Sequence, residues 1–267
     1  MKTLKLNQVE HTKKIGKDCP YYEPNVKEDC LLEVDGEIIG FYINDVSKYN
    51  ERLKLLIDVA NKEFRSDNVP KQEMSRGPQG TKEDKAKRQL TGKNLVTQYS
   101  TILGSIAPNA VMRRPYPNIS SVHRDKKAQT FIKAMWGVCL EAENVIKEVA
   151  PHLHKNQVEL FEDVDKKWRF GNMFTSSISN FNIAASFHRD TANIEGTVNV
   201  ILTKRHNANG GCLNVPDYNV TFEQADNSML VYPAWKNMHG VTPIKPISED
   251  GYRNSLIFYP LKAFKGI

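Results

Sequence analysis

The chain has 267 residues, enough for one domain with a sizeable core or for two. Its composition, 40% hydrophobic and 25% charged, is ordinary for a globular protein, and no apolar run reaches the length that a membrane-spanning helix needs. The net charge of +6 suits a polyanionic partner, and the first residues lack a secretory signal, so we expect an intracellular protein, cytoplasmic or nuclear.

The first part of the chain predicts a hairpin followed by a helix. Asp35-Gly36 separates two apolar stretches and is a strong signal for a two-residue turn, so strands are expected over 31–34 and 37–43. Over 46–64 the spacing of apolar residues becomes helical. One face of this helix is expected to carry Tyr49, Leu53, Leu56, Val59 and Ala60.

Residues 71–93 form a basic segment that is nearly free of apolar side chains. It carries seven cationic residues against three acidic ones. One interpretation is a solvated loop, and the other is an arm that follows the phosphate backbone of a nucleic acid; the sequence leaves both open. A strand is expected after this segment, over 97–106.

Two helices are expected in the middle of the chain. The longer one should begin near Asp125, because a carboxylate at a helix start interacts favourably with the free N–H groups there. It carries apolar residues at core spacing and should end before Pro151. The second helix is expected over 155–167.

Beyond Arg169 the pattern changes to short β-branched and aromatic stretches separated by turns. Strands this short and this closely spaced predict a sandwich, a barrel or a jelly roll. The stretches cover residues 174–187, 196–203, 212–215, 219–222, 229–232 and 253–259.

Together these patterns predict an α+β fold with a double-stranded β-helix, or jelly-roll, core. We expect residues 1–267 to form one composite domain, in which 1–170 give mainly helical support and 171–267 form the jelly roll. The four cysteines are scattered and contain no CxxC pair, which predicts reduced thiols rather than a disulfide framework. They are Cys19, Cys30, Cys139 and Cys212.

Three residues of the last third are candidate ligands of a metal ion. His188 and Asp190 lie two apart at the end of an apolar strand, and side chains two apart on extended backbone point to the same side. His239 follows a separate strand and a short connection. Two neutral imidazoles and one carboxylate hold Fe(II) while leaving coordination positions open, as non-haem iron oxygenases require.

Arg253 adds a candidate site for a co-substrate. It opens the last predicted strand, fourteen residues after His239, and Ser255 points to the same side of that strand. A guanidinium here suits the far carboxylate of 2-oxoglutarate, a keto acid that chelates such an iron, and the hydroxyl could donate a further hydrogen bond. The pattern therefore predicts an oxygenase that uses Fe(II), 2-oxoglutarate and O2.

A second His-x-Asp sequence, His123-Arg124-Asp125, has the same letters in a different context. It leads into the predicted long helix and does not follow an apolar strand. Its two side chains would therefore not share one strand face. We expect a surface turn with Asp125 at the helix start.

Three blocks of the last third resemble the TET/JBP oxygenases, which oxidise the 5-methyl group of pyrimidines in DNA. Residues 187–204 resemble the metal-strand block of that family, with an HRD, an Asn three residues beyond the Asp, a Gly-Thr and an apolar strand. Residues 227–232 and 238–244 resemble the block around the second histidine, and 253–259 is similar to the terminal Arg-x-Ser-Leu-x-Phe-Tyr strand. The resemblance covers roughly residues 174–262.

The resemblance agrees with the metal and co-substrate roles above and implies two contacts to a substrate. Asn193 would contact the target base, and Tyr259 would stack on it. DNA is the implied partner, bound through a basic surface with the target base flipped out of the stack. At Leu261 the chain departs from methylcytosine-oxidising members, which carry a histidine that bonds the base, so thymine is an alternative to 5-methylcytosine.

Two other functions fit the same residues. One is a 2-oxoglutarate oxygenase that acts on a protein side chain or a small metabolite, because it would share every metal and co-substrate residue. The other is a nucleic-acid-binding jelly roll without catalysis. The sequence does not decide the oligomeric state or the roles of Arg113 and Arg114.

Overall fold

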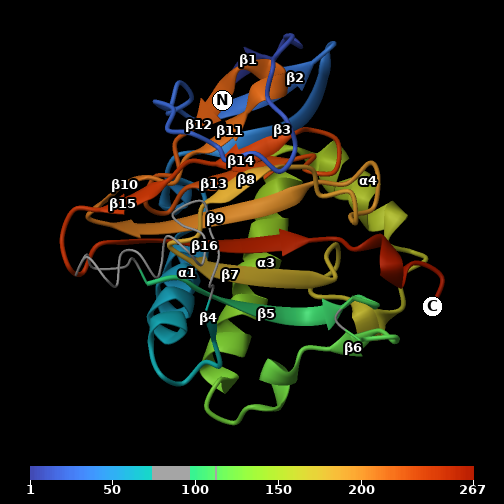
Figure 1. The fold of residues 1–267 in the computed structure, drawn as a ribbon. Helices are drawn as coiled ribbons and strands as arrows, with labels where there is room; N and C mark the ends of the chain where they lie inside the picture. Colours follow the sequence, from blue (N-terminus) through green and yellow to red (C-terminus); the bar gives the residue numbers. More distant parts are fainter. Residues whose placement is uncertain (74–96, 112) are drawn as a thin grey trace.

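The structure is a computed structural model that describes residues 1–73, 97–111 and 113–267. In this part of the chain a large sheet, a small sheet and three helices pack together, which confirms the α+β fold with a jelly-roll core (Figure 1). Most of the predicted basic segment, from residue 74 onwards, lies outside the described residues.

The large sheet contains ten strands among the described residues, in the order β1-β2-β3-β13-β9-β16-β7-β5-β4, with β6 beside β5. Strands of the last third and β7 form the middle of this sheet, and strands of the first half flank them on both sides, so the sheet is not confined to the last third as the sequence pattern indicated. The strands are β1 (Lys2–Lys5), β2 (Cys30–Val34), β3 (Glu37–Ile43), β4 (Gln72–Glu73), β5 (Tyr99–Ile106), β6 (Asn118–Ile119), β7 (Ser176–Phe181), β9 (Asn199–His206), β13 (Met229–Tyr232) and β16 (Tyr252–Tyr259).

The small sheet faces the large one and has four strands in the described chain, in the order β12-β11-β14-β8. A separate two-stranded ribbon pairs β10 with β15. The strands are β8 (Ala185–His188), β10 (Ala208–Gly210), β11 (Leu213–Val215), β12 (Val220–Phe222), β14 (His239–Val241) and β15 (Ile244–Pro246).

The predicted hairpin is confirmed, and its turn has the expected geometry. Asp35 and Gly36 have φ angles of 52° and 86°, the left-handed backbone that a two-residue turn between twisted strands requires. The hairpin joins β2 to β3, and β3 then pairs with β13 from the last third of the chain. The hairpin thus places two N-terminal strands in the same sheet as the strands of the last third.

The predicted strand over 174–187 is two strands that belong to different sheets. The chain turns at Asn182, whose φ of 54° ends β7 before β8 begins. The Asn182 side-chain oxygen accepts a hydrogen bond from the backbone N–H of Arg253 at 2.8 Å, which fixes this turn against β16. Because of the turn, β8 crosses to the small sheet and delivers His188 opposite the large one.

The helices are α1 (Glu51–Arg65), α3 (Gln129–Val149) and α4 (Pro151–Leu160). In α1 the predicted face is partly wrong, because Val59 is 42% exposed whereas Ile57 is fully buried. The long helix begins four residues later than expected, since the Asp125 side chain accepts a hydrogen bond from the Lys127 N–H and forms a turn instead. The second helix begins at Pro151, because a proline suits a first helical position, and it ends at Leu160 rather than near 167.

Helices α1 and α3 cover one face of the large sheet (Figure 1). Alternate residues of the central strands pack against them, and the intervening residues point to the small sheet. The buried residues on the helical side include Val200, Leu202, Met229, Val231, Leu256 and Phe258. The other face of the same strands is therefore free to carry a site.

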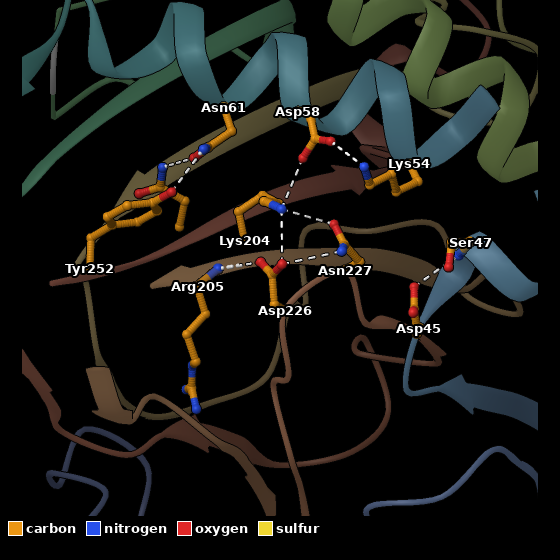
Figure 2. A network of polar contacts seen from close by, with 11 residues as sticks. Asp45, Ser47, Lys54, Asp58, Asn61, Lys204, Arg205, Asp226, Asn227 and Tyr252 are labelled. Carbon is orange, nitrogen blue, oxygen red and sulfur yellow. Dashed lines mark hydrogen bonds and ion pairs between the residues drawn. The ribbon is translucent and has the colours of Figure 1, made fainter. Parts of the chain in front are cut away.

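A polar network ties α1 to β9 (Figure 2). Lys204 forms ion pairs with Asp58 of α1 at 2.9 Å and with Asp226 at 3.0 Å, and Asp58 also pairs with Lys54 at 2.9 Å. The Lys204 ammonium is nearly buried, so its charge is compensated as buried charges must be. This contact fixes the helix on the sheet.

Two further expectations concern the whole chain. All four cysteines are buried and free, as the scattered spacing predicted. Within the described residues, no helix is both long and apolar enough to cross a membrane.

Candidate active site

A pocket of about 320 Å³ lies between the two sheets. Its volume is within the range of about 300–1,000 Å³ that is usual for ligand sites. The large sheet contributes side chains of β7, β9, β13 and β16, and the small sheet contributes side chains of β8, β11 and β14. The candidate residues that line it are His188, Asp190, Asn193, His239, Arg253, Ser255 and Tyr259. The fold therefore brings every candidate residue to one cavity.

His188, Asp190 and His239 converge in this pocket. Each offers one ligand atom, and these atoms lie within 4.8 Å of one another. The two histidines are directly paired across β8 and β14, which places their ring centroids 4.2 Å apart. The His188 Nε2 lies 3.6 Å from the Asp190 Oδ1. Two imidazoles and one carboxylate on one face are the donors that Fe(II) takes in oxygenases.

Both histidines are oriented by backbone carbonyls. The His188 Nδ1 lies 2.7 Å from the Ser186 carbonyl oxygen, and the His239 Nδ1 lies 3.0 Å from that of Asn237. A carbonyl can only accept, so each Nδ1 carries the hydrogen and each Nε2 presents a lone pair. This tautomer is the one that a metal ligand at Nε2 needs.

Burial shifts the titration of two of these residues. It lowers the pKa of His239 to about 3, with a smaller contribution from His188, so His239 is neutral near pH 7. Burial raises the pKa of Asp190, although His188 and a hydrogen bond from Asn199 act in the opposite direction. A bound cation would stabilise the ionised form of this carboxylate.

Asp190 is held by a chain of two amides, Asn199 and Asn193, of which the sequence indicated Asn193 as a site residue but not Asn199. The Asn199 Nδ2 donates to the Asp190 Oδ2 at 2.8 Å, and the Asn193 Nδ2 donates to the Asn199 Oδ1 at 2.8 Å. Asn199 opens β9 and is the one polar residue in the run 198–202. This isolated polar residue was the signal from which the sequence could have indicated a functional role. An inward-facing polar residue in an apolar strand needs a buried partner.

Arg253 and Ser255 lie on the pocket side of β16 and carry donors without acceptors. Arg253 is 2% exposed, and its guanidinium donates from Nη2 to the Gln224 Oε1 at 3.3 Å. Its Nε, the Ser255 hydroxyl and the Gln224 Nε2 are buried with no hydrogen-bond partner among the described residues. Buried donors without partners are costly, so this cluster fits an anionic ligand such as a carboxylate.

Tyr259 and Leu261 also line the pocket. Tyr259 is the last residue of β16, and burial raises the pKa of its phenol, which therefore remains protonated. Leu261 lies opposite Asn193 in an isolated bridge between the two segments. An apolar side chain thus stands beside the amide for which the resemblance implies a base contact.

The second His-x-Asp sequence is structural, but it is not the surface turn that we expected. His123 lies in a short 3₁₀ helix and is half-buried, and its Nε2 accepts a hydrogen bond from the Gly104 N–H at 2.8 Å. Burial lowers the pKa of His123, which favours the neutral ring that accepts this bond. Arg113 and Arg114 do not line the site pocket.

The sequence of residues 107–262 matches the Tet_JBP family, described as the oxygenase domain of the 2OGFeDO superfamily. No curated protein matches the sequence of this chain. Among solved structures, NgTET1 in complex with 5mC DNA is similar with a TM-score of 0.58 at 13% identity, covering 95% of this chain and 84% of that one. At this identity the likeness shows a shared fold.

Two other solved structures share less of the architecture. An oxidoreductase of the 2OG-Fe(II) oxygenase family from Burkholderia pseudomallei has a TM-score of 0.40 at 15% identity, covering 76% of this chain and 77% of that one. A full-length Neurospora crassa protein in complex with alpha-KG has a TM-score of 0.40 at 10% identity, covering 83% of this chain and 75% of that one. The family match itself spans more than half of the 267 residues. The chain therefore belongs to the Tet_JBP family, and it is an Fe(II)- and 2-oxoglutarate-dependent dioxygenase.

Proposed function

We propose that this dioxygenase hydroxylates the 5-methyl group of a pyrimidine in DNA, either 5-methylcytosine or thymine. The observation that carries the proposal is a single pocket that is lined by a metal triad, by a cluster of buried donors without acceptors in the described chain, and by the Asn193 amide and the Tyr259 ring. The structural neighbour NgTET1, solved with 5mC DNA, supports the same substrate class.

In this proposal His188, Asp190 and His239 hold Fe(II), and Arg253 with Ser255 holds the far carboxylate of 2-oxoglutarate. The unpartnered donors on Arg253 and Ser255 support the second assignment. When bound there, Fe(II) and 2-oxoglutarate would activate O2, of which one oxygen atom would enter the methyl C–H bond and the other the succinate that forms as carbon dioxide leaves. The protein contributes the open metal face, the apolar walls and the aim of the methyl group.

The Asn193 amide has hydrogen-bonding capacity left for a base. An ionised carboxylate only accepts, so Asn199 must present its NH2 to Asp190 and its oxygen to Asn193. Asn193 then donates one N–H to Asn199, which leaves its Oδ1 and its second N–H. Its Oδ1 suits a donor such as the ring N–H of thymine or the amino group of 5-methylcytosine.

The substrate must also leave the double helix. The metal-binding atoms lie inside the cavity between two sheets, and a methyl group in a stacked duplex cannot reach them. Tyr259 offers a flat ring to a flipped base, and the net charge of +6 favours contact with phosphates. The proposal requires that the enzyme share a compartment with DNA. An intracellular protein, cytoplasmic or nuclear, meets this requirement.

The whole chain takes part in this proposal as one composite oxygenase domain. Strands β1, β2, β3 and β5 are hydrogen-bonded into the same sheet as β9 and β16, which line the pocket. Separating 1–170 from 171–267 would break the β3–β13 and β5–β7 pairings and expose the sheet core. We therefore expect neither part to fold alone.

The direct test is incubation of the protein with Fe(II), 2-oxoglutarate and O2 on three DNA duplexes. One contains 5-methylcytosine, one contains thymine without methylcytosine, and one contains uracil in place of thymine and no methylcytosine. We expect hydroxymethyl bases by mass spectrometry on at least one of the first two and none on the third. Asp190→Ala should abolish the product, whereas Asp67→Ala, which removes an exposed carboxylate, should not.

Each other outcome points to a different enzyme. Succinate release without base oxidation on either methylated substrate would remove the DNA assignment and leave an oxygenase of protein side chains or small metabolites. DNA binding that is unchanged in Asp190→Ala, with no succinate release in the wild type, would favour the non-catalytic alternative.

A further inference from the structure

Arg205 and Arg253 are directly opposite each other on the neighbouring strands β9 and β16. Side chains of directly opposed residues in an antiparallel pair lie on the same face of the sheet. Figure 2 shows that the Arg205 side chain leaves β9 away from α1, whereas the adjacent Lys204 points toward that helix. The two guanidinium groups therefore share the pocket side of the large sheet.

The contacts around Gly211 show that these side chains converge. A Cβ atom on Gly211 would lie 3.3 Å from the Arg253 Cδ and 3.4 Å from the Arg205 Nη2. The φ of Gly211 is +67°, which a side chain rarely adopts. The bare backbone at this position leaves room for both arginines.

Neither guanidinium is neutralised within the described residues. Arg205 donates from Nη2 to the Gly210 carbonyl oxygen and Arg253 donates from Nη2 to Gln224, so both acceptors are uncharged. The Nε of each is buried without an acceptor in the described chain. Burial, followed by the charge of Arg205, lowers the pKa of Arg253 to about 9, so Arg253 remains charged near pH 7.

We propose that Arg205 is a positioning residue for the co-substrate, a second cation that acts with Arg253 on the far carboxylate of 2-oxoglutarate. Two like charges this close repel each other, and an anion that enters beside them relieves the repulsion. The pair thus selects a keto acid with a second carboxylate at its far end. The inference rests on the proposed role of Arg253 and adds a residue to it.

The test measures binding rather than turnover. The probe is N-oxalylglycine, an analogue with both carboxylates, titrated by calorimetry into protein loaded with Mn(II). Arg205→Gln should weaken its binding about tenfold, because one of two nearby charges is lost. Arg205→Lys should retain most of the affinity. Lys245→Gln, which removes an exposed charge from the adjacent ribbon strand β15, should have no effect.

A second probe separates an electrostatic role from a structural one. The acid 2-oxobutyrate has the same keto-acid end but no far carboxylate, so its binding should be unchanged by Arg205→Gln. Equal weakening of both acids, or no weakening of N-oxalylglycine, would overturn the proposal. A thermal melt identifies a variant that fails to fold, in which case Arg205→Lys decides: full affinity in that variant supports the charge role and a large loss contradicts it.

The same titrations distinguish failure of this inference from failure of the assignment beneath it. If Arg253→Gln abolishes N-oxalylglycine binding and Arg205→Gln does not weaken it, only the role of Arg205 is wrong. If the wild-type protein does not bind N-oxalylglycine at all, the co-substrate site itself is wrong and the inference fails with it.

Discussion

Hydrogen bonds from outside the metal triad hold its three side chains in place. The imidazoles of His188 and His239 donate to backbone carbonyls, and Asp190 accepts from Asn199. Such partners fix the tautomer and rotamer of a ligand. The side chain therefore loses less conformational entropy when a metal binds. Asn193 then orients Asn199 through its own amide. A residue implied in base contact is thus also linked to the metal site.

We expect Asn199→Ala to weaken Mn(II) binding about 10- to 100-fold, the usual effect of losing a hydrogen bond to a metal ligand. The reason is that the Asp190 carboxylate would lose its amide donor and gain rotational freedom. Titration of Mn(II) followed by electron paramagnetic resonance measures the affinity. Asn209→Ala, at an exposed position of β10, is the control, and an equal loss in both variants would contradict the expectation.

At the scale of elements, one nearly buried lysine adds a polar contact to the apolar packing of α1 on the sheet. Lys204 of β9 meets Asp58 of α1 and Asp226 of the loop before β13, as Figure 2 shows. Asn61 of the same helix also donates to the Tyr252 hydroxyl at 3.1 Å. These contacts join α1 to β9 and β16, the strands whose other face lines the pocket.

Replacing Lys204 with Met should lower the free energy of unfolding by about 1–3 kcal/mol, since two carboxylates lose a charged hydrogen-bond donor. Lys54→Met, which removes only the partly exposed pair within α1, should cost at most about 0.5 kcal/mol. Urea denaturation measures both. Equal effects of the two substitutions would show that the buried contact of Lys204 contributes no more to the free energy of unfolding than the partly exposed one of Lys54.

A second buried charge, Glu143 of α3, fixes the turn before β7. Its carboxylate accepts hydrogen bonds from the Asn172 N–H at 2.8 Å, the Asn172 side-chain amide at 2.7 Å and the Met173 N–H at 3.2 Å. Burial raises the pKa of Glu143 above its ordinary value, and these bonds only partly oppose the shift. The folded state therefore binds this proton more tightly than the unfolded state does.

The contribution of Glu143 protonation to stability should be complete below its ordinary pKa of 4.5 and should be lost as the pH rises through the raised folded pKa. We therefore expect the stability of the wild type relative to Glu143→Gln to decrease as the pH rises above about 4.5. Urea denaturation of both proteins at a series of pH values measures this difference. A difference that stays constant with pH would contradict the expectation.

At the scale of the whole molecule, the large sheet separates two kinds of environment. Its helical face is an apolar core, and its other face presents asparagine, serine, arginine and tyrosine to the pocket. One set of strands thus supplies both the stability and the site, because successive side chains of a strand point to opposite faces. The net charge of +6 is a property of the whole chain, and it bears on the proposed binding of DNA.

If DNA is the substrate, its affinity should fall as salt rises, with a logarithmic slope of about −0.9 for each phosphate that a cation neutralises. Fluorescence anisotropy of a labelled duplex at several salt concentrations measures the slope. Replacing Lys85, Lys87 and Arg88 with serine tests the arm hypothesis for residues 71–93. An unchanged slope would favour the solvated loop, and N-oxalylglycine binding should be the same in both proteins.

The sequence was sufficient for features that depend on short-range order. The Asp35-Gly36 turn, the end of the long helix before Pro151 and the identity of the family all followed from neighbouring residues. It was weaker at helix starts: Asp125 suits an N-cap, but it bonds its own turn instead. Local propensities of this kind are small, so a competing local hydrogen bond can move a boundary by several residues.

The sequence by itself therefore determined the fold class, the family and which side chains were candidates for the site. Only the tertiary structure decided which residues stand beside them: Asn199 beside Asp190, Gln224 beside Arg253, and Arg205 opposite Arg253. These relations depend on strand register and on the turn at Asn182 that sends β8 to the second sheet. Where no short turn joins two strands, their register depends on how segments distant in sequence pack, which local sequence shows only in part.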